Sequence, residues 1–196
     1  MSSQPHEFDS PSPWVCRWAA LIPAGGRVLD VACGHGRHLR YLSSLGFAVV
    51  GVDRDEAALG ALRETGGIEI HVADIEAGPW PFAPGGFDGV VVTNYLHRPL
   101  FQDLVGALRP GGVLIYETFA LGNERYGRPS NPAFLLQPGE LLQSLEPLAV
   151  VAFEQGLVSA PKQAVVQRVC AVRAGKGPAP LDAVRVSAGG QAIALK

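Results

Sequence analysis

The fold of this chain is decided by residues 28–42, which read VLDVACGHGRHLRYL. An apolar, β-branched run leads into a glycine-bearing turn, and the segment after it places Leu39 and Leu42 on one helical face. Gly34 and Gly36 allow the backbone of this turn to approach a ligand closely. A buried strand, a tight turn and a helix in this order predict the first unit of an α/β fold.

Strand-like and helix-like segments alternate beyond this unit, which predicts a parallel sheet with helices on both faces. Apolar runs predict five strands, at 27–32, 47–52, 68–72, 87–93 and 113–118. Helices are predicted at 35–45, with Leu45 continuing the buried stripe, between Asp55 and Gly66, at 100–108 and at 138–145. Two more strands, 148–153 and 164–173, are predicted to form a hairpin at the sheet edge.

The length of 196 residues fits one domain with short appendages. We expect a helical lead-in over residues 1–26 and the domain proper over 27–173. Residues 119–137, here called the lid segment, are polar and contain glycine and proline, and loops of this length are commonly functional. The sequence therefore predicts a mobile lid that closes over a substrate. Residues 174–196 are expected to be a mostly flexible tail.

The composition favours a protein that acts on a small molecule. Hydrophobic residues make up 47% of the chain and charged residues 17%, enough to bury a core. The net charge of -2 comes without a local run of Lys or Arg, so no nucleic-acid partner is expected. No apolar stretch approaches the roughly 20 residues that span a bilayer, and the polar first residues lack the layout of a signal peptide.

Cysteine and histidine usage predicts neither a disulfide framework nor a metal site. Cys16, Cys33 and Cys170 lie far apart and include no C-x-x-C pair. His35 and His38 are three residues apart on an expected helix, without an evident third ligand. We therefore expect a cytoplasmic protein without a metal and without a membrane partner, and the oligomeric state stays open.

Three aspartates stand at the ends of successive predicted strands. Asp30 lies at the end of the first strand, Asp53 ends the second and Asp74 follows the third. Carboxyl ends of parallel strands meet at one edge of a sheet, where open α/β sheets bind ligands. A carboxylate in the position of Asp53 can accept hydrogen bonds from both hydroxyls of an adenosine ribose. A single acid here could be a helix cap, but three in succession favour a nucleotide-like ligand.

At this point the chain resembles the class I S-adenosylmethionine-dependent methyltransferases, and more loosely their small-molecule members of the tellurite-resistance type. The resemblance rests on ordered segments that read VLDVACGHGRHLRYL, VVGVDRDEAAL, VADIEAGPWPF, FDGVVVTNYLH and LRPGGVLIYETF. It implies a Rossmann-like doubly wound α/β sheet of seven strands, mostly parallel with the last one antiparallel. It also implies S-adenosylmethionine as cofactor, S-adenosylhomocysteine as product and direct in-line transfer of the methyl group.

The resemblance assigns the cofactor site residue by residue. Asp30 and the Gly34–Gly36 turn would hold the methionine part, Asp53 the ribose, and Asp74 with Ile75 the adenine. The full set predicted to bind the cofactor is Asp30, Ala32, Gly34, Gly36, Asp53, Arg54, Asp74, Ile75 and Asn94. Ala32 departs from the glycine that such families often carry, and we expect only a small shift of the turn.

A nicotinamide or flavin dinucleotide is the competing cofactor. Its G-x-G-x-x-G fingerprint needs a third glycine for close helix packing, and Leu39 stands in that place. A dinucleotide also places its pyrophosphate at the helix N-terminus, where Asp30 would repel it. The acid suits a cationic amino group instead, which favours the methyltransferase over a dinucleotide-binding oxidoreductase.

Residues that could act on the acceptor lie near the fourth and fifth strand ends and in the lid segment. The candidates are Tyr95, His97, Glu117 and Tyr126, of which His97 could be a base or simply a helix cap. Arg125 and Arg128 could recognise an anionic substrate or be solvated loop charges. The fourth strand end lacks the (Asn/Asp)-Pro-Pro-aromatic motif of enzymes that methylate nucleobase or amide nitrogens. A methyltransferase-like binding protein without turnover remains the alternative.

Overall fold

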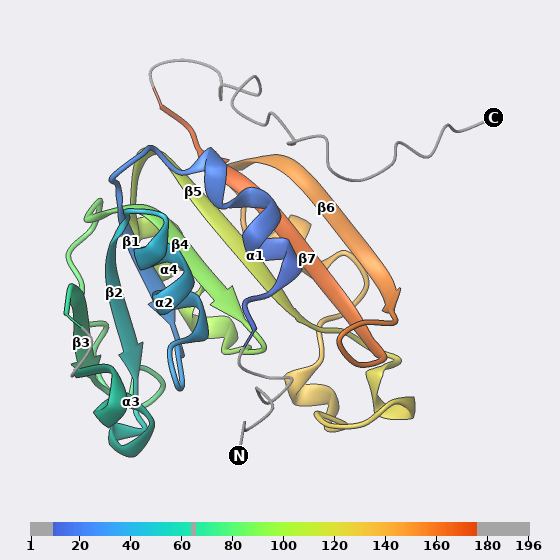
Figure 1. Cartoon of the computed structure of the whole chain (residues 1–196). Helices are drawn as coiled ribbons and strands as arrows, with labels where there is room; N and C mark the ends of the chain where they lie inside the picture. The colour runs from blue at the N-terminus through green and yellow to red at the C-terminus, as the bar shows by residue number, and fades with distance from the viewer. Residues whose placement is uncertain (1–9, 64–65, 176–196) are drawn as a thin grey trace, which may run out of the picture.

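The computed structural model describes residues 10–63 and 66–175 and folds them around one seven-stranded sheet (Figure 1). The strand order is β3-β2-β1-β4-β5-β7-β6. Strands β1 to β5 pair in parallel, whereas β7 runs antiparallel to both of its neighbours, β5 and β6. The predicted fold class, including the antiparallel last strand, is confirmed.

The bounds of the elements follow the sequence pattern closely. The strands are β1 Arg27–Val31, β2 Ala48–Asp53, β3 Ile68–Val72, β4 Phe87–Thr93, β5 Leu108–Phe119, β6 Leu148–Val158 and β7 Ala164–Arg173. The α-helices are α1 Pro13–Trp18, α2 Arg37–Ser44, α3 Glu56–Arg63, α4 Phe101–Ala107 and α5 Glu140–Ser144. Short 3-10 helices are η1 Ala19–Leu21, η2 Arg98–Leu100, η3 Asn123–Arg125 and η4 Pro132–Phe134.

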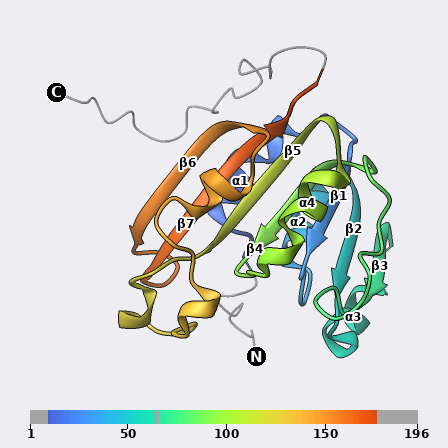
Figure 2. The same ribbon diagram turned by 180° about the vertical axis from the view of Figure 1, so that it is seen from behind.

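The sheet is covered by helices on both faces, which gives two hydrophobic layers. One layer packs Trp14, Leu42 and Leu62, from α1, α2 and α3, against the sheet (Figure 1). The other packs Leu104 of α4 and Leu141 of α5 against the opposite face, seen in Figure 2. Every residue of β4 is buried, as expected for the central strand of a sheet covered on both sides.

Several bounds differ from the sequence prediction, most of all in β5 and in β6, which runs to Val158 rather than ending at residue 153. Strand β5 begins at Leu108 rather than at residue 113, because Leu108 already pairs with Phe87 of β4. The register then shifts, so that Val113 pairs with Gly89. Leu45 was predicted to continue the buried stripe of α2, but its side chain is 49% exposed. The helix ends at Ser44, and Leu45 and Gly46 form its C-terminal turn, so Leu45 no longer follows the helical stripe.

The order of the strands places a ligand crevice beside β1. Strand β2 pairs with one side of β1 and β4 with the other, so the connections leave β1 and β4 in opposite directions along the sheet. In a doubly wound sheet the crevice outside the carboxyl ends of the strands at such a reversal is where ligands bind. We call this side of the molecule the carboxyl edge.

The lead-in helix lies against the sheet. Trp14 and Trp18 are buried, with ring centroids 5.5 Å apart, and the Trp14 indole N–H donates to the Val169 carbonyl over 3.2 Å. Within the described residues no helix is long and apolar enough to cross a membrane. The predicted flexible tail lies outside the described residues, apart from positions 174 and 175.

Candidate functional site

A cavity of about 230 Å³ opens at the carboxyl edge, where β1, β2, β3 and β4 end. It is lined by Ala32, Asp53, Arg54, Ala73, Asp74, Ile75, Glu76 and Tyr95. Five of the residues predicted to bind the cofactor are therefore brought together here: Ala32, Asp53, Arg54, Asp74 and Ile75. Asp30, Gly34, Gly36 and Asn94 are not part of this wall.

The turn after β1 has the backbone that its glycines predict. Gly34 and Gly36 both have positive φ, and the space where a Cβ of Gly34 would stand is open. The amide of Gly34 donates to Asp53 Oδ2 over 2.8 Å, which joins the turn to the end of β2. A Cβ on Gly36 would displace the end of the Leu62 side chain, and the φ of 72° disfavours any residue other than glycine.

Ala32 adopts a left-handed conformation, with φ of 54°. A residue other than glycine pays of order 1–3 kcal/mol for such a backbone, and such strain is concentrated at functional sites. Ala32 thus holds a backbone conformation that glycine adopts at lower cost, and the expected small shift of the turn stays a prediction. The methyl side chain of Ala32 forms part of the cavity wall.

Asp30 is the most perturbed acid at the carboxyl edge. Its side chain is 1% exposed, and Oδ2 has no hydrogen-bond partner among the described residues. Burial raises the pKa of Asp30 to about 8, with the charge of Arg37 opposing the rise and that of Asp53 adding to it. A buried carboxyl with a free oxygen suits an ammonium group, and this observation fits the amino end of S-adenosylmethionine.

Asp53 and Asp74 end their strands in different ways. Asp53 accepts amide protons on both oxygens, from Gly34 on Oδ2 and from Asp55 on Oδ1. Asp74 Oδ1 accepts the amides of Glu76 and Ala77, and these bonds hold the pKa of its carboxyl below the usual range. Both carboxylates are oriented by backbone amides, retain acceptor capacity and face the cavity, as hydroxyl and amino groups of an adenosine would require.

Beyond the end of β4, Tyr95 lines the cavity, whereas Asn94 and His97 on either side of it do not. Asn94 has a φ of 56° and donates its amide to the Glu117 carbonyl, which turns the chain away from the sheet. The hydroxyl of Tyr95 is buried without a hydrogen-bond partner in the described part of the chain. Burial and the nearby Glu76 carboxylate raise the pKa of Tyr95, so the phenol keeps its proton. His97 Nδ1 lies 4.0 Å from Glu76 Oε2.

Three of the predicted acceptor-side residues, His97, Glu117 and Tyr126, stand apart from the cavity wall. Glu117 uses both carboxylate oxygens within the protein, accepting the Ser12 hydroxyl over 2.8 Å and an Arg168 N–H over 3.0 Å. Tyr126 lies in the lid segment with 36% of its surface exposed. Because none of the three lines the cavity, a catalytic role for them stays a prediction.

The lid segment is anchored along part of its length. The side chain of Asn123 is buried, accepting from the Val165 amide and donating to the Pro129 carbonyl. Arg98 forms a two-bond ion pair with Glu140 and donates to carbonyls at 133 and 135. Residues 124–126 and 130–134 are exposed between these anchors, so the predicted closing motion concerns the middle of the segment.

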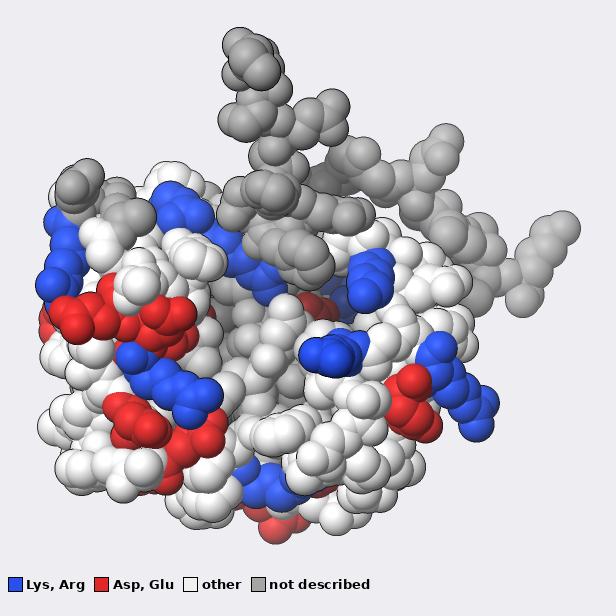
Figure 3. Space-filling view, turned by 90° about the horizontal axis from the view of Figure 1, so that it is seen from below, with Lys and Arg blue, Asp and Glu red and all other residues white. Residues whose placement is uncertain are grey.

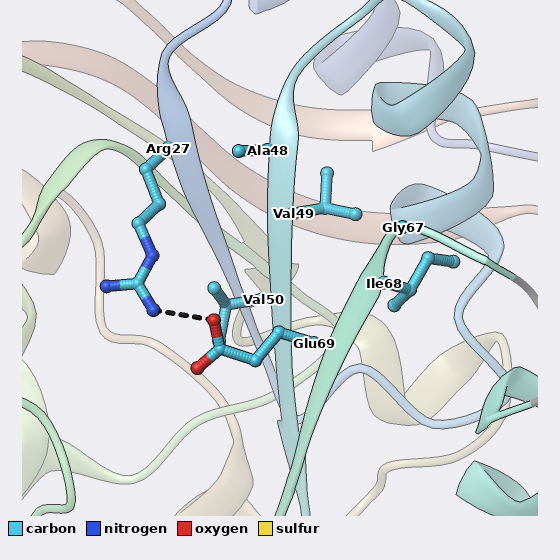
Figure 4. A pocket seen from close by; sticks show the side chains of 7 residues that line it. All are labelled: Arg27, Ala48, Val49, Val50, Gly67, Ile68 and Glu69. Carbon is cyan, nitrogen blue, oxygen red and sulfur yellow. Dashed lines mark hydrogen bonds and ion pairs between the residues drawn. The ribbon is translucent and has the colours of Figure 1, made fainter.

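A larger hollow of about 310 Å³ lies at the opposite edge, where β1, β2 and β3 begin. Figure 4 shows Arg27 and Glu69 paired beside the apolar side chain of Val50, and the nitrogen–oxygen distance of this pair is 2.8 Å. Its charged groups neutralise each other, and none of the residues predicted to bind the cofactor contributes to it. The smaller cavity at the carboxyl edge is therefore the candidate functional site.

Sequence reasoning missed part of the site. Glu76 and Ala73 line the cavity, and their position beside the strand-end Asp74 was the signal that could have revealed them. His38 was considered only as a metal ligand, whereas its ring lies beside Asp30 and Thr93. The connection of Ser12 to His38 and Glu117 spans 26 and 105 residues and has no local sequence signal.

Residues 28–112 match a family described as a methyltransferase domain. A tRNA U34 carboxymethyltransferase of Methylococcus capsulatus is 32% identical over 155 residues, which cover 69% of this chain and 48% of that protein. A ubiquinone biosynthesis O-methyltransferase of Aromatoleum aromaticum is 36% identical over 115 residues, which cover 54% of this chain and 48% of that protein. The chain thus spans about half the length of these curated relatives.

The fold is shared with the crystal structure of TehB from Haemophilus influenzae, with a TM-score of 0.67 at 21% sequence identity. The likeness covers 79% of this chain and 60% of that chain. The family match includes every residue that lines the cavity, from Ala32 to Tyr95, and the free oxygen of Asp30 fits the cofactor of this family. Residues 28–112 thus match a methyltransferase domain, on a fold that the chain shares with TehB.

Proposed function

We propose that the protein transfers the methyl group of S-adenosylmethionine directly to a small-molecule acceptor. The observation that carries this proposal is the cavity at the carboxyl edge, whose walls combine Asp53, Asp74 and Tyr95 from three successive strand ends. The buried, unpartnered oxygen of Asp30 supports a cationic amino group beside it. The three cysteines are free thiols, which is in keeping with the cytoplasmic location that we propose.

The protein's own contribution is to bind the cofactor, to orient the reacting groups and to exclude water from the site. When bound, S-adenosylmethionine supplies a methyl group on a sulfonium centre that is open to in-line displacement. Asp30 would accept a hydrogen bond from the ammonium group, Asp53 would accept hydrogen bonds from the ribose hydroxyls, and Asp74 with Ile75 would frame the adenine. Tyr95 keeps its proton and closes the wall at the end of β4, which helps to hold the reacting atoms in line.

A small acceptor is favoured over RNA by the distribution of charge. Six of the described arginines pair with an acid within 4 Å: Arg17, Arg27, Arg63, Arg98, Arg109 and Arg168. Arg125, Arg128 and Lys162 have no ion-pair partner among residues 10–63 and 66–175, and Lys162 Nζ lies close to Gly127 of the lid segment. Such a small cluster suits one anionic group better than the repeated phosphates of a nucleic acid.

Figure 3 looks onto the carboxyl edge and shows how charge is distributed there. Acidic side chains gather on the side of α3, while basic side chains dominate on the side of the lid segment. The face is hollowed between the two groups. An acceptor that carries a carboxylate or phosphate would be drawn to the basic side, with its nucleophile toward the cavity.

The proposal is tested by S-adenosylhomocysteine formation in three reactions, with a small-metabolite extract, with bulk RNA and without acceptor. We expect product with the small-molecule fraction, and weaker turnover after Arg125→Gln and Arg128→Gln together. Product formed with RNA instead would replace the small acceptor by an RNA substrate. Tight binding of S-adenosylhomocysteine without turnover on either fraction would favour the non-catalytic alternative.

Proximity and a dry site, rather than a dedicated base, are proposed to drive the chemical step. Removal of His97, Glu117 or Tyr126 one at a time should then lower kcat by less than the roughly 10²–10⁴-fold typical of a general acid or base. His97 is the residue most able to overturn this, because histidine is the side chain that most often acts as a general base. If kcat of the parent falls at acidic pH, and His97→Ala loses both this dependence and more than a hundredfold in rate, His97 is a base.

A further inference from the structure

The entry to α1 is tied to the cofactor side of the sheet by Ser12. This residue is 5% exposed, and its hydroxyl both accepts the Trp14 amide and donates to Glu117 Oε1. Its backbone N–H donates to Nε2 of the buried His38 over 3.1 Å. Ser12 therefore links the N-terminal helix to α2 and to β5 at the same time.

The hydrogen bond from Ser12 determines which nitrogen of His38 carries the proton. A backbone amide can only donate, so Nε2 must be the bare, accepting nitrogen. Burial holds the pKa of His38 near 3, so the ring is neutral and its single proton is on Nδ1. That N–H faces Thr93 Oγ1 at 3.4 Å and Asp30 Oδ2 at 3.9 Å.

The Asp30 oxygen that faces His38, Oδ2, has no hydrogen-bond partner in the described part of the chain. Oδ2 is buried, and its distance of 3.9 Å from His38 Nδ1 exceeds the range of a hydrogen bond. An ammonium group at Asp30 would favour the ionised carboxylate, whose charge then attracts a second donor. A shift of less than about 1 Å would bring the Nδ1–H of His38 within bonding distance.

We propose that His38 is a positioning residue for the cofactor site: its Nδ1–H donates to Asp30 when the site is filled, and its Nε2 holds Ser12 and α1 in place. This inference rests on the proposed cofactor. It makes one imidazole the link between the ligand's amino end and the N-terminal helix that covers the sheet. Binding at Asp30 thereby stabilises the position of residues 12–18.

The two bonds of His38 can be removed separately. In His38→Gln the amide oxygen takes the place of Nε2 and still accepts from Ser12, but no donor faces Asp30. In His38→Asn the amide nitrogen takes the place of Nδ1 and still donates toward Asp30, but Ser12 loses its acceptor. Thermal unfolding is measured for both variants. A variant that unfolds at the parent's temperature but binds more weakly has lost a binding contact and not its fold.

The readouts are S-adenosylhomocysteine affinity by calorimetry and amide hydrogen exchange of residues 12–18. We expect His38→Gln to lose about tenfold or more in affinity, the loss expected for a hydrogen bond to a charged group. His38→Asn should keep its affinity within about threefold and lose the protection that ligand gives to residues 12–18. Equal affinity in His38→Gln and the parent would overturn the inference, as would equal losses of affinity in both variants.

Nitrogen NMR of the parent tests the inference without any substitution. We expect the Nδ1–H tautomer in the free protein and a downfield shift of its proton on ligand binding, as a stronger hydrogen bond forms. An Nε2–H tautomer, or no change at Nδ1 on binding, would contradict it. If the parent itself binds no S-adenosylhomocysteine, the proposed function fails instead, so the two failures are distinguishable.

Discussion

The two halves of the carboxyl edge differ in whether their buried polar groups have hydrogen-bond partners. In the half formed by β1 to β4, buried polar atoms are left without partners, namely Asp30 Oδ2 and the Tyr95 hydroxyl. In the half formed by β5, β7 and the lid segment, Glu117 uses both oxygens and Asn123 both amide atoms within the protein. The first half has buried polar atoms that a ligand can pair with. In the second half the buried polar groups already form hydrogen bonds that hold the lid segment in place.

We infer from this difference that the polar groups of the first half serve ligand binding and those of the second half stabilise the fold. An unpaired buried polar group costs about 1–3 kcal/mol, which a ligand can recover when it supplies the missing partner. The satisfied half offers no such gain, and its available charges are the exposed Arg125, Arg128 and Lys162. We infer that cofactor affinity is determined by β1 to β4 and that acceptor recognition depends on the rim of the lid segment.

The largest expected effect is on cofactor affinity. Asp53→Ala should weaken S-adenosylhomocysteine binding by about 1.5–3 kcal/mol, the contribution of hydrogen bonds to a charged group. Calorimetry measures the change, with exposed Glu56→Gln as a control that should bind like the parent. Because Asp53 also accepts two backbone amides, thermal unfolding is needed to separate lost contacts from a loosened turn. Unchanged affinity would mean that the ribose is held elsewhere.

The next effect concerns the satisfied half. Asn123→Ala leaves the Val165 amide and the Pro129 carbonyl without their partner and should lower the free energy of unfolding by about 2 kcal/mol. Urea unfolding measures it, and the exposed Asn131→Ala, which removes one capping bond, should cost about 1 kcal/mol or less. Cofactor affinity should stay within twofold in both. A large loss of affinity in Asn123→Ala would show that the two halves are not independent.

A third prediction concerns the proton on Asp30. The pKa of this acid is raised to about 8 in the folded protein, so the folded state binds its proton more tightly than the unfolded state. Its contribution to stability is therefore present below about pH 4 and is lost as the pH rises toward 8. An ammonium ligand needs the ionised form, so binding near pH 7 should release a proton.

Affinity for S-adenosylhomocysteine should then rise by up to about tenfold per pH unit between pH 6 and 7.5. Calorimetry in buffers of different ionisation enthalpy counts the released proton. His38 does not titrate in this window, because its pKa lies near 3. Asp30→Asn should abolish the pH dependence as well as weakening binding. A parent protein whose affinity is flat across this range would place the amino group away from Asp30.

The smallest effect is expected at the rim. Arg125→Gln should change the free energy of unfolding by no more than about 0.5 kcal/mol, as for other surface positions without partners. Arg98→Gln is the matched comparison, because Arg98 pairs with Glu140 and two carbonyls, and it should destabilise clearly more. If both substitutions destabilise equally, Arg125 has a structural role and is not free to meet an acceptor.

The sequence by itself determined the fold and the gathering of five predicted cofactor residues around one cavity. Strand and helix periods, the glycine turn at 34–36 and the acids Asp53 and Asp74 are local features, and parallel strands necessarily gather their carboxyl ends at one edge. Glycine adopts the positive φ of this turn without steric cost, and Ala32 adopts a left-handed backbone beside it. Local chemistry was therefore sufficient for these parts.

Only the tertiary structure decided which polar groups remain available. Glu117 reads as a catalytic candidate in the sequence, yet Ser12 and Arg168, 105 and 51 residues away along the chain, occupy its oxygens. His38 reads as an ordinary helix residue, yet it lies beside the unfilled oxygen of Asp30. Hydrogen bonds reach only about 3 Å and join residues from any distance along the chain, so their pairing follows from packing and leaves no periodic trace in the sequence.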